Sequence, residues 1–80
     1  MVDVDFEDQF QKLFSRLDPA QKEKVRGRIR KIVQNPEIGK PMMYDRKGTR
    51  ELYVRPFRLS YVYIKDQKII FLDIYHKDEQ

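Results

Sequence analysis

The last third of the chain contains two strand-like stretches separated by only four residues. Phe57–Ile64 and Ile69–His76 are rich in β-branched and aromatic residues, and the polar segment Lys65–Lys68 lies between them. Two such runs joined by a short polar loop predict a β-hairpin. This hairpin constrains the fold more than any other feature, because every other segment must pack against it or extend it.

The register of this hairpin follows from which side chains can be buried together. If Ile64 pairs with Ile69, Tyr61 lies opposite Leu72 and the apolar residues form one unbroken face. The residues on this face are Phe57, Leu59, Tyr61, Tyr63, Ile70, Leu72 and Ile74. A slip of one residue would place Asp73 on the same face, and burying an unpaired carboxylate is costly. The opposite, open face then receives Arg58, Ser60, Asp73, Tyr75 and Lys77.

The first half of the chain reads as one short strand followed by two helices. Val2–Phe6 alternates in steps of two, and Asp8–Leu17 carries apolar residues at helical spacing. A second helix is expected to begin at Pro19 and to end before Pro36. With a further strand at Arg50–Arg55, the predicted fold is a single α+β domain over residues 1–80. We expect the order β-α-α-β-β-β, with the helical hairpin on one face of a small antiparallel sheet.

Composition excludes several classes of protein. The chain has no cysteine and a single histidine, so it offers neither disulfides nor a zinc site, and we expect no metal and no cofactor. It has no apolar run of the length that spans a bilayer. Its first residues are acidic, unlike the basic start of a signal peptide. A cytoplasmic protein without membrane contact is therefore expected.

Positive charge is concentrated in the middle of the chain. Residues 21–58 contain twelve basic and four acidic residues, a net charge of +8, whereas the whole chain has +4. Such a basic belt favours a polyanionic partner, either nucleic acid or an acidic protein segment. For the helical part of the belt, an ordinary solvated face explains the charges equally well.

The predicted open face combines cations with aromatic rings. If Leu52 and Val54 join the core, the residues Glu51, Tyr53 and Arg55 point outward beside Arg58 and Tyr75. Cations that hold phosphates and rings that stack on bases suit single-stranded RNA. The alternative is a face that is simply wet, because antiparallel sheets commonly expose one side to solvent.

Four segments together resemble the RelE/ParE family of toxin–antitoxin toxins. They are "VDVDFEDQFQKL", "NPEIGKP", "RELYVRPFRLSYVYI" and "IIFLDIYHKDEQ", and they cover nearly the whole chain. The resemblance to the RelE branch implies a ribosome-dependent endoribonuclease that cuts messenger RNA without a metal. In that reaction the ribose 2′-hydroxyl attacks the adjacent phosphate. The protein stabilises the charge that develops on the phosphorane.

The resemblance also implies site residues. Arg58 in "FRLSY" matches the strand arginine of the family and would contact the scissile phosphate. Lys77 follows the last strand and would neutralise the phosphorane or protonate the leaving oxygen, and His76 matches a C-terminal histidine of YoeB-like members. The hairpin register points His76 toward the helices, so a half-buried structural histidine is the alternative. Residues expected to bind the RNA around these groups are Lys47, Arg50, Tyr53, Arg55 and Tyr75.

The chain departs from the family where a general base is expected. Glu51 and Tyr53 stand where RelE has a lysine pair, and Met42 stands where YoeB-like members have a glutamate. The base is therefore unassigned. Glu51 is a candidate, although an ion pair with Arg50 or Arg55 is an equally good explanation for it.

Family membership further implies a cognate, RelB-like antitoxin and ribosome-bound messenger RNA as partners. The basic belt and the apolar stripes of the helices offer a surface for an acidic, amphipathic helix. Two other functions remain open for this fold: a ParE-like toxin that inhibits DNA gyrase, and a binding module without catalytic activity.

Overall fold

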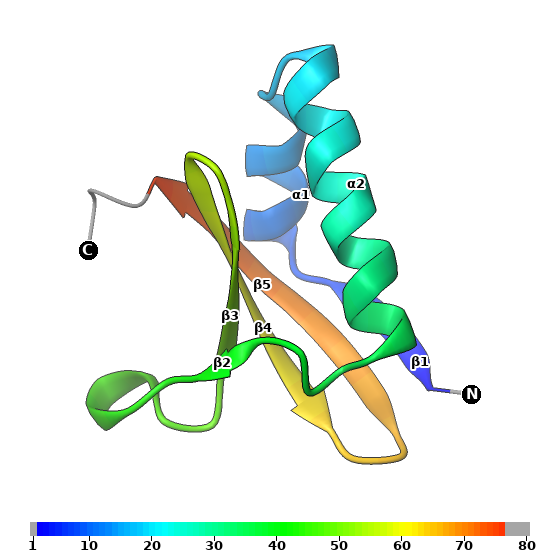
Figure 1. Cartoon of the computed structure of the whole chain (residues 1–80), viewed down its shortest axis with the longest axis vertical. Helices are drawn as coiled ribbons and strands as arrows, with labels where there is room; N and C mark the ends of the chain where they lie inside the picture. Colours follow the sequence, from blue (N-terminus) through cyan, green and yellow to red (C-terminus); the bar gives the residue numbers. More distant parts are fainter. Residues whose placement is uncertain (1, 77–80) are drawn as a thin grey trace.

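The protein has the predicted α+β fold, in which a strand and two helices precede the rest of the sheet (Figure 1). The computed structural model describes residues 2–76. The elements are β1 (Asp3–Phe6), α1 (Asp8–Ser15), α2 (Pro19–Gln34), β2 (Lys40–Pro41), the 3₁₀ turn η1 (Tyr44–Arg46), β3 (Arg50–Val54), β4 (Phe57–Ile64) and β5 (Lys68–His76).

The sheet is mixed, which differs from the antiparallel sheet expected. Its five strands lie in the order β1-β5-β4-β3-β2, and β1 pairs with β5 in parallel. A parallel pair needs a long connection between its strands, and here the two helices and the other strands supply it. The short edge strand β2 and the turn η1 were not predicted, because a two-residue strand containing Pro41 carries no alternating pattern.

The start of α2 was predicted correctly, and local hydrogen bonds explain it. The Asp18 side chain accepts from the Gln21 amide at 2.8 Å, and the Gln21 side chain accepts from the Asp18 amide at 3.2 Å. This reciprocal capping box fixes the first turn of the helix. Helix α1 ends at Ser15, two residues before the predicted end at Leu17. The amide of Leu17 bonds to the carbonyl of Phe14, three residues back, so the last turn has tightened before the chain enters α2.

The predicted register of the β4–β5 hairpin is correct in one half only. Leu59 pairs with Ile74 and Ser60 with Asp73, as expected, but a β-bulge follows. Beyond it Tyr61 pairs with Phe71 rather than Leu72. The prediction that Ile70 and Leu72 lie under the helices is therefore wrong, and Ile69 and Phe71 are the buried residues. The bulge keeps Asp73 off the apolar face while bringing Phe71 onto it, a change of side that an unbroken alternation cannot produce.

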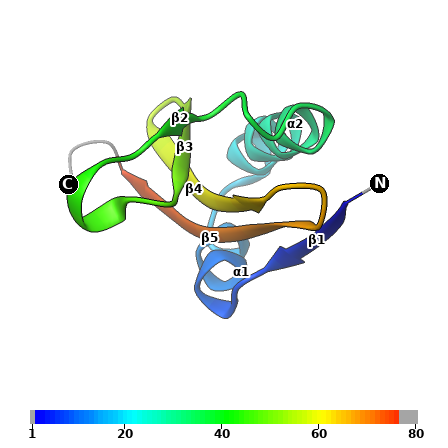
Figure 2. The same ribbon diagram turned by 90° about the horizontal axis from the view of Figure 1, so that it is seen from below.

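Both helices contribute to one core against the sheet. Phe10 of α1 and Val25 and Ile32 of α2 are buried with the sheet residues Val54, Leu59, Tyr61, Ile69, Phe71 and Ile74. The Phe10 and Phe71 rings lie 5.5 Å apart between centroids. The loop between β2 and β3 projects away from both helices (Figures 1 and 2). No helix within residues 2–76 is long and apolar enough to cross a membrane.

Candidate functional site

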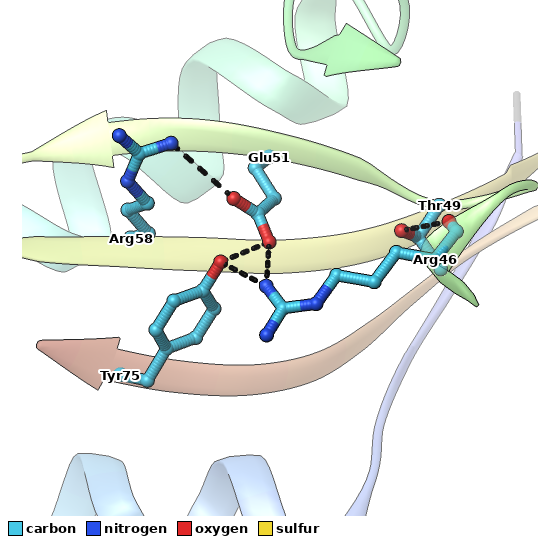
Figure 3. Close-up of polar contacts among 5 residues, drawn as sticks. All are labelled: Arg46, Thr49, Glu51, Arg58 and Tyr75. Carbon is cyan, nitrogen blue, oxygen red and sulfur yellow. Dashed lines mark hydrogen bonds and ion pairs between the residues drawn. The ribbon is translucent and has the colours of Figure 1, made fainter. Parts of the chain in front are cut away.

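A buried carboxylate lies on the face of the sheet that the helices leave open. The side chain of Glu51, on β3, is only 2% exposed. Its Oε2 accepts a hydrogen bond from Arg46 Nη1 at 2.8 Å and another from the Tyr75 hydroxyl, and its Oε1 lies 3.5 Å from Arg58 Nη1. Figure 3 shows these four side chains converging above β3, β4 and β5. We call Arg46, Glu51, Arg58 and Tyr75 the Glu51 cluster.

The strand pairing explains why these residues meet. Glu51 pairs with Ser60 in the β3–β4 ladder, and Arg58 pairs with Tyr53 on one side and Tyr75 on the other. Residues two apart on one strand share a face, so Glu51, Arg58 and Tyr75 project from the same side of the sheet. The predicted grouping of Tyr53, Arg58 and Tyr75 on the open face is confirmed by this register.

The Glu51 cluster keeps a surplus of positive charge. Two guanidinium groups surround one carboxylate, and the side chains of Arg46 and Arg58 are 44% and 30% exposed. The buried Nε of Arg58 has no hydrogen-bond partner among the described residues. Buried donors normally have a partner, so this N–H is an exception in the Glu51 cluster, and an anionic ligand would meet the exposed part of the Arg58 side chain instead. The Arg58 guanidinium also lies 6.0 Å from the centroid of the Tyr53 ring.

The environment holds Tyr75 in its protonated form. Burial raises the pKa of the Tyr75 hydroxyl above its ordinary value, and the hydrogen bond to the Glu51 carboxylate raises the pKa further, although the Arg46 charge opposes both effects. Arg46 lies over the Tyr75 ring, 4.9 Å from its centroid. Tyr75 is thus a neutral hydrogen-bond donor placed between two cations.

Sequence reasoning missed Arg46 as a site residue and gave Glu51 the wrong ionic partners. We expected Glu51 to act as a base or to pair with Arg50 or Arg55, whereas it pairs with Arg46 and Arg58. Arg46 comes from an irregular turn, where no periodicity tells which way a side chain points. The one signal in the sequence was its place among basic residues in the loop that contains Gly48, just before β3.

The remaining predicted residues differ in where they lie. Lys47, in the loop before β3, and Arg55, directly after β3, are exposed, whereas Lys77 lies outside the described residues. Arg50 and His76 are not brought together with Arg58. The side chain of Arg50 donates to the carbonyls of Glu37 and Gly39, at 3.1 and 2.7 Å, and so anchors the segment before β2.

His76 lies on the helix side of the sheet, as the register argument indicated. It pairs with Phe57 in the β4–β5 ladder, and the two rings meet edge to face with centroids 6.0 Å apart. It lines a shallow pocket with Leu13 and Leu17 at the end of α1. Neighbouring residues on a strand point to opposite faces, so His76 and Tyr75 project to opposite sides of the sheet. Within residues 2–76, no group of acidic or histidine side chains is arranged to hold a metal ion.

The fold and this constellation agree with a family assignment. A family model described as the ParE toxin of the type II toxin–antitoxin system parDE matches residues 2–80. The chain belongs to the RelE/ParE toxin superfamily. It is accordingly a toxin of a type II toxin–antitoxin system.

Solved structures of this superfamily share the fold at low sequence identity. A chain of the intact E. coli RelBE toxin–antitoxin complex is 17% identical with a TM-score of 0.80, covering 100% of each chain. In the RelBE2 complex from Mycobacterium tuberculosis the values are 20% and 0.84, covering 95% of this chain and 98% of the other. For E. coli YafQ they are 22% and 0.77, with 98% and 96% covered. No curated protein matches the chain in sequence.

Proposed function

We propose that this toxin is an endoribonuclease that cuts ribosome-bound messenger RNA. The observation that carries the proposal is Arg58, whose side chain is 30% exposed on the open face and whose Nη1 lies 3.5 Å from the Glu51 carboxylate. The residue stands in the "FRLSY" setting of the RelE branch. A guanidinium is suited to contact a phosphate through two of its N–H groups, which would place the scissile phosphodiester over Arg58.

In the proposed reaction the ribose 2′-hydroxyl gives its proton to solvent water and its oxygen attacks the adjacent phosphate. The bond from phosphorus to the 5′-oxygen breaks, which leaves a 2′,3′-cyclic phosphate. Arg58 and Arg46 would offset the negative charge that develops on the phosphorane oxygens. Tyr75 would remain protonated, because burial raises its pKa above the ordinary value of a tyrosine hydroxyl. Lys77 is proposed to give the proton that the leaving 5′-oxygen requires.

Glu51 is better suited to organise this site than to act as the base. Its Oε2 accepts from Arg46 and Tyr75, and its Oε1 faces Arg58. A general base must reach the proton that it removes, and a carboxylate that is only 2% exposed is shielded from a substrate hydroxyl in this arrangement. We therefore propose that Glu51 positions Arg46, Arg58 and Tyr75.

The decisive experiment compares three proteins on a message held on ribosomes. Wild type should cut the message, and Arg58→Ala should reduce the cleavage rate by about a hundredfold or more, the size expected when a charge-stabilising donor is lost. The control is Lys24→Ala, which also removes one positive charge but lies exposed on α2. Absence of cleavage by wild type, or equal cleavage by wild type and Arg58→Ala, would contradict the proposal.

Inhibition of DNA gyrase is the second candidate function. The observation that favours it is the matching family model, which is described as the ParE toxin. Supercoiling assays with purified gyrase separate the two functions. A toxin that blocks supercoiling and leaves ribosome-bound message intact would establish the second function and exclude the first.

We also propose that a cognate antitoxin binds a groove between the two helices. The groove has a volume of about 480 Å³ and is lined by the apolar side chains of Phe6, Phe10, Phe14 and Ile29, with Gln11, Arg26 and Arg30 at its rim. Arg26 lies over the Phe14 ring, 5.4 Å from the centroid. An apolar floor with a basic rim suits an amphipathic segment that carries acidic residues. The similar structures include toxin–antitoxin complexes, so toxins of this fold are bound by antitoxins.

The groove is tested by changing its charge without changing its floor. The double variant Arg26→Glu and Arg30→Glu should lose affinity for the antitoxin, whereas Arg16→Glu, at the end of α1, should not. Affinity measured by calorimetry distinguishes the two results. Equal affinity for both variants would exclude this groove as the antitoxin site.

A further inference from the structure

The loop between β2 and β3 is fixed to the open face rather than free in solvent. Its two ends are joined by a hydrogen bond from the Met42 amide to the Thr49 carbonyl at 2.9 Å. Inside the loop, the Arg46 carbonyl accepts from the Thr49 amide at 3.0 Å and from the Thr49 hydroxyl at 2.7 Å. Arg46 then binds Glu51 in the sheet (Figure 3). The loop is therefore held in one position beside Arg58.

Tyr44 is the unusual residue of this loop. Its φ is +58°, in the left-handed region, and the residue is 89% exposed. Residues other than glycine, asparagine and aspartate rarely adopt this backbone conformation. Exposure gains nothing for the fold either, because the aromatic ring is not removed from water. Tyrosine at this position is thus unfavourable for folding on both counts, and such residues are concentrated at functional sites.

The surroundings of Tyr44 indicate the kind of ligand. Arg46 lies two residues further along the loop with its guanidinium in the Glu51 cluster, and the exposed Lys47 follows it. An exposed ring next to cations is the combination that binds single-stranded nucleic acid, where cations hold the phosphates and rings stack on the bases. The ring is presented by a fixed loop, so little ordering is needed when a base binds.

We propose that Tyr44 stacks on an unpaired base of the RNA whose phosphate lies at Arg46 and Arg58. This inference rests on the proposed ribonuclease function and adds a base-binding subsite to it. Stacking tolerates any base, so the subsite would strengthen binding and position the scissile phosphate without imposing a strict sequence.

Two substitutions separate the ring from the backbone conformation. Tyr44→Asn removes the ring but tolerates a positive φ, so its melting temperature should equal or exceed that of wild type. Its KM for ribosome-bound message should rise about tenfold, the loss expected for one stacked base. Tyr44→Phe keeps the ring and should cut like wild type. If Tyr44→Asn and Tyr44→Phe have equal KM values, the proposal is wrong.

A second measurement does not depend on cleavage. A message carrying 5-bromouridine in the ribosomal A site is irradiated with the toxin, and the crosslinked residue is identified by mass spectrometry. A crosslink to Tyr44 in a protein that does not cut would support the subsite and contradict the ribonuclease function. Cleavage by a protein that gives no crosslink to Tyr44 with bromouridine at any A-site position would overturn the subsite alone. Loss of antitoxin affinity in Tyr44→Asn with unchanged KM would also overturn it, because Tyr44 and its exposed neighbour Met43 would then serve the protein partner.

Discussion

Arg58 and Tyr75 lie directly opposite each other in the β4–β5 ladder, and the carboxylate of Glu51 from β3 binds both side chains. Three adjacent strands thus each contribute one residue to the same polar cluster. The fourth member, Arg46, comes from the loop that precedes β3 and closes the cluster on its exposed side. A loop and a sheet are joined here by one buried carboxylate, so changes at Glu51 should affect both.

Replacement of Glu51 should separate its structural role from its charge. Glu51→Ala leaves two guanidinium groups facing each other without a counter-ion, and we expect a loss of about 1–3 kcal/mol in the free energy of unfolding. Glu51→Gln keeps the shape of the side chain and should lose less. Chemical denaturation measures both values.

The same two variants test Glu51 as a positioning residue. If Glu51 positions the arginines, Glu51→Gln should retain more activity than Glu51→Ala and should keep the pH profile of wild type. If Glu51 were the base, both variants should be equally inactive, since an amide cannot accept a proton. Kinetics on ribosome-bound message decides between these outcomes.

The strands and the open face were predictable because their residues alternate. The pairing of Leu59 with Ile74 follows from the cost of burying Asp73, and the structure has this pairing. The bulge after Ser60 was not predictable in the same way. The bulged register and the unbroken register each bury a set of apolar side chains. Phe71 is buried rather than Leu72 because its ring packs against those of Phe6 and Phe10, which lie near the other end of the chain.

The loop that carries Arg46 shows where sequence reasoning ends. Hydrogen bonds from Thr49 and positive φ angles at Tyr44 and Gly48 determine its shape. A strand or helix repeats its geometry, so one residue predicts the direction of the next, but a turn of this kind does not. The prediction of Glu51 on the open face was correct, whereas its partner Arg46 lies in an irregular loop, whose residues do not alternate in direction.

His76 should contribute little to catalysis if Arg58 marks the active surface. The two side chains project to opposite sides of the sheet, and His76 contacts the Phe57 ring. We expect His76→Ala to keep the cleavage rate within a few-fold of wild type and to lose about 1 kcal/mol of stability through the ring contact. A loss of activity comparable to that of Arg58→Ala, at unchanged stability, would show that His76 reaches the substrate.

Two glycines should respond in opposite ways to alanine. A Cβ at Gly39 would lie 2.5 Å from the Tyr61 hydroxyl oxygen, and Tyr61 is buried and cannot move aside. Gly39→Ala should cost about 1–3 kcal/mol of stability, as other overpacking substitutions do.

Gly27 lies inside α2, where an added Cβ would meet only the flexible end of the Arg30 side chain, at 3.9 Å. Gly27→Ala should therefore stabilise the protein by about 0.5–1 kcal/mol, because alanine is the better helix former. Thermal unfolding of both variants gives the comparison, and equal shifts would contradict the packing around Tyr61.

Stability should fall at alkaline pH because two tyrosines must ionise on unfolding. Burial is the first cause that raises the pKa of Tyr61, and burial is also the first cause for Tyr75. A raised pKa in the folded state means that the folded protein binds the proton more tightly. The stabilisation is complete below the unfolded pKa of about 10 and is lost as the pH rises through the folded values. Tyr75→Phe should flatten this fall, and Tyr44→Phe is the control because Tyr44 is 89% exposed. The free energy of unfolding is measured by denaturation at a series of pH values above about 9. An equal fall in wild type and both variants would contradict the prediction.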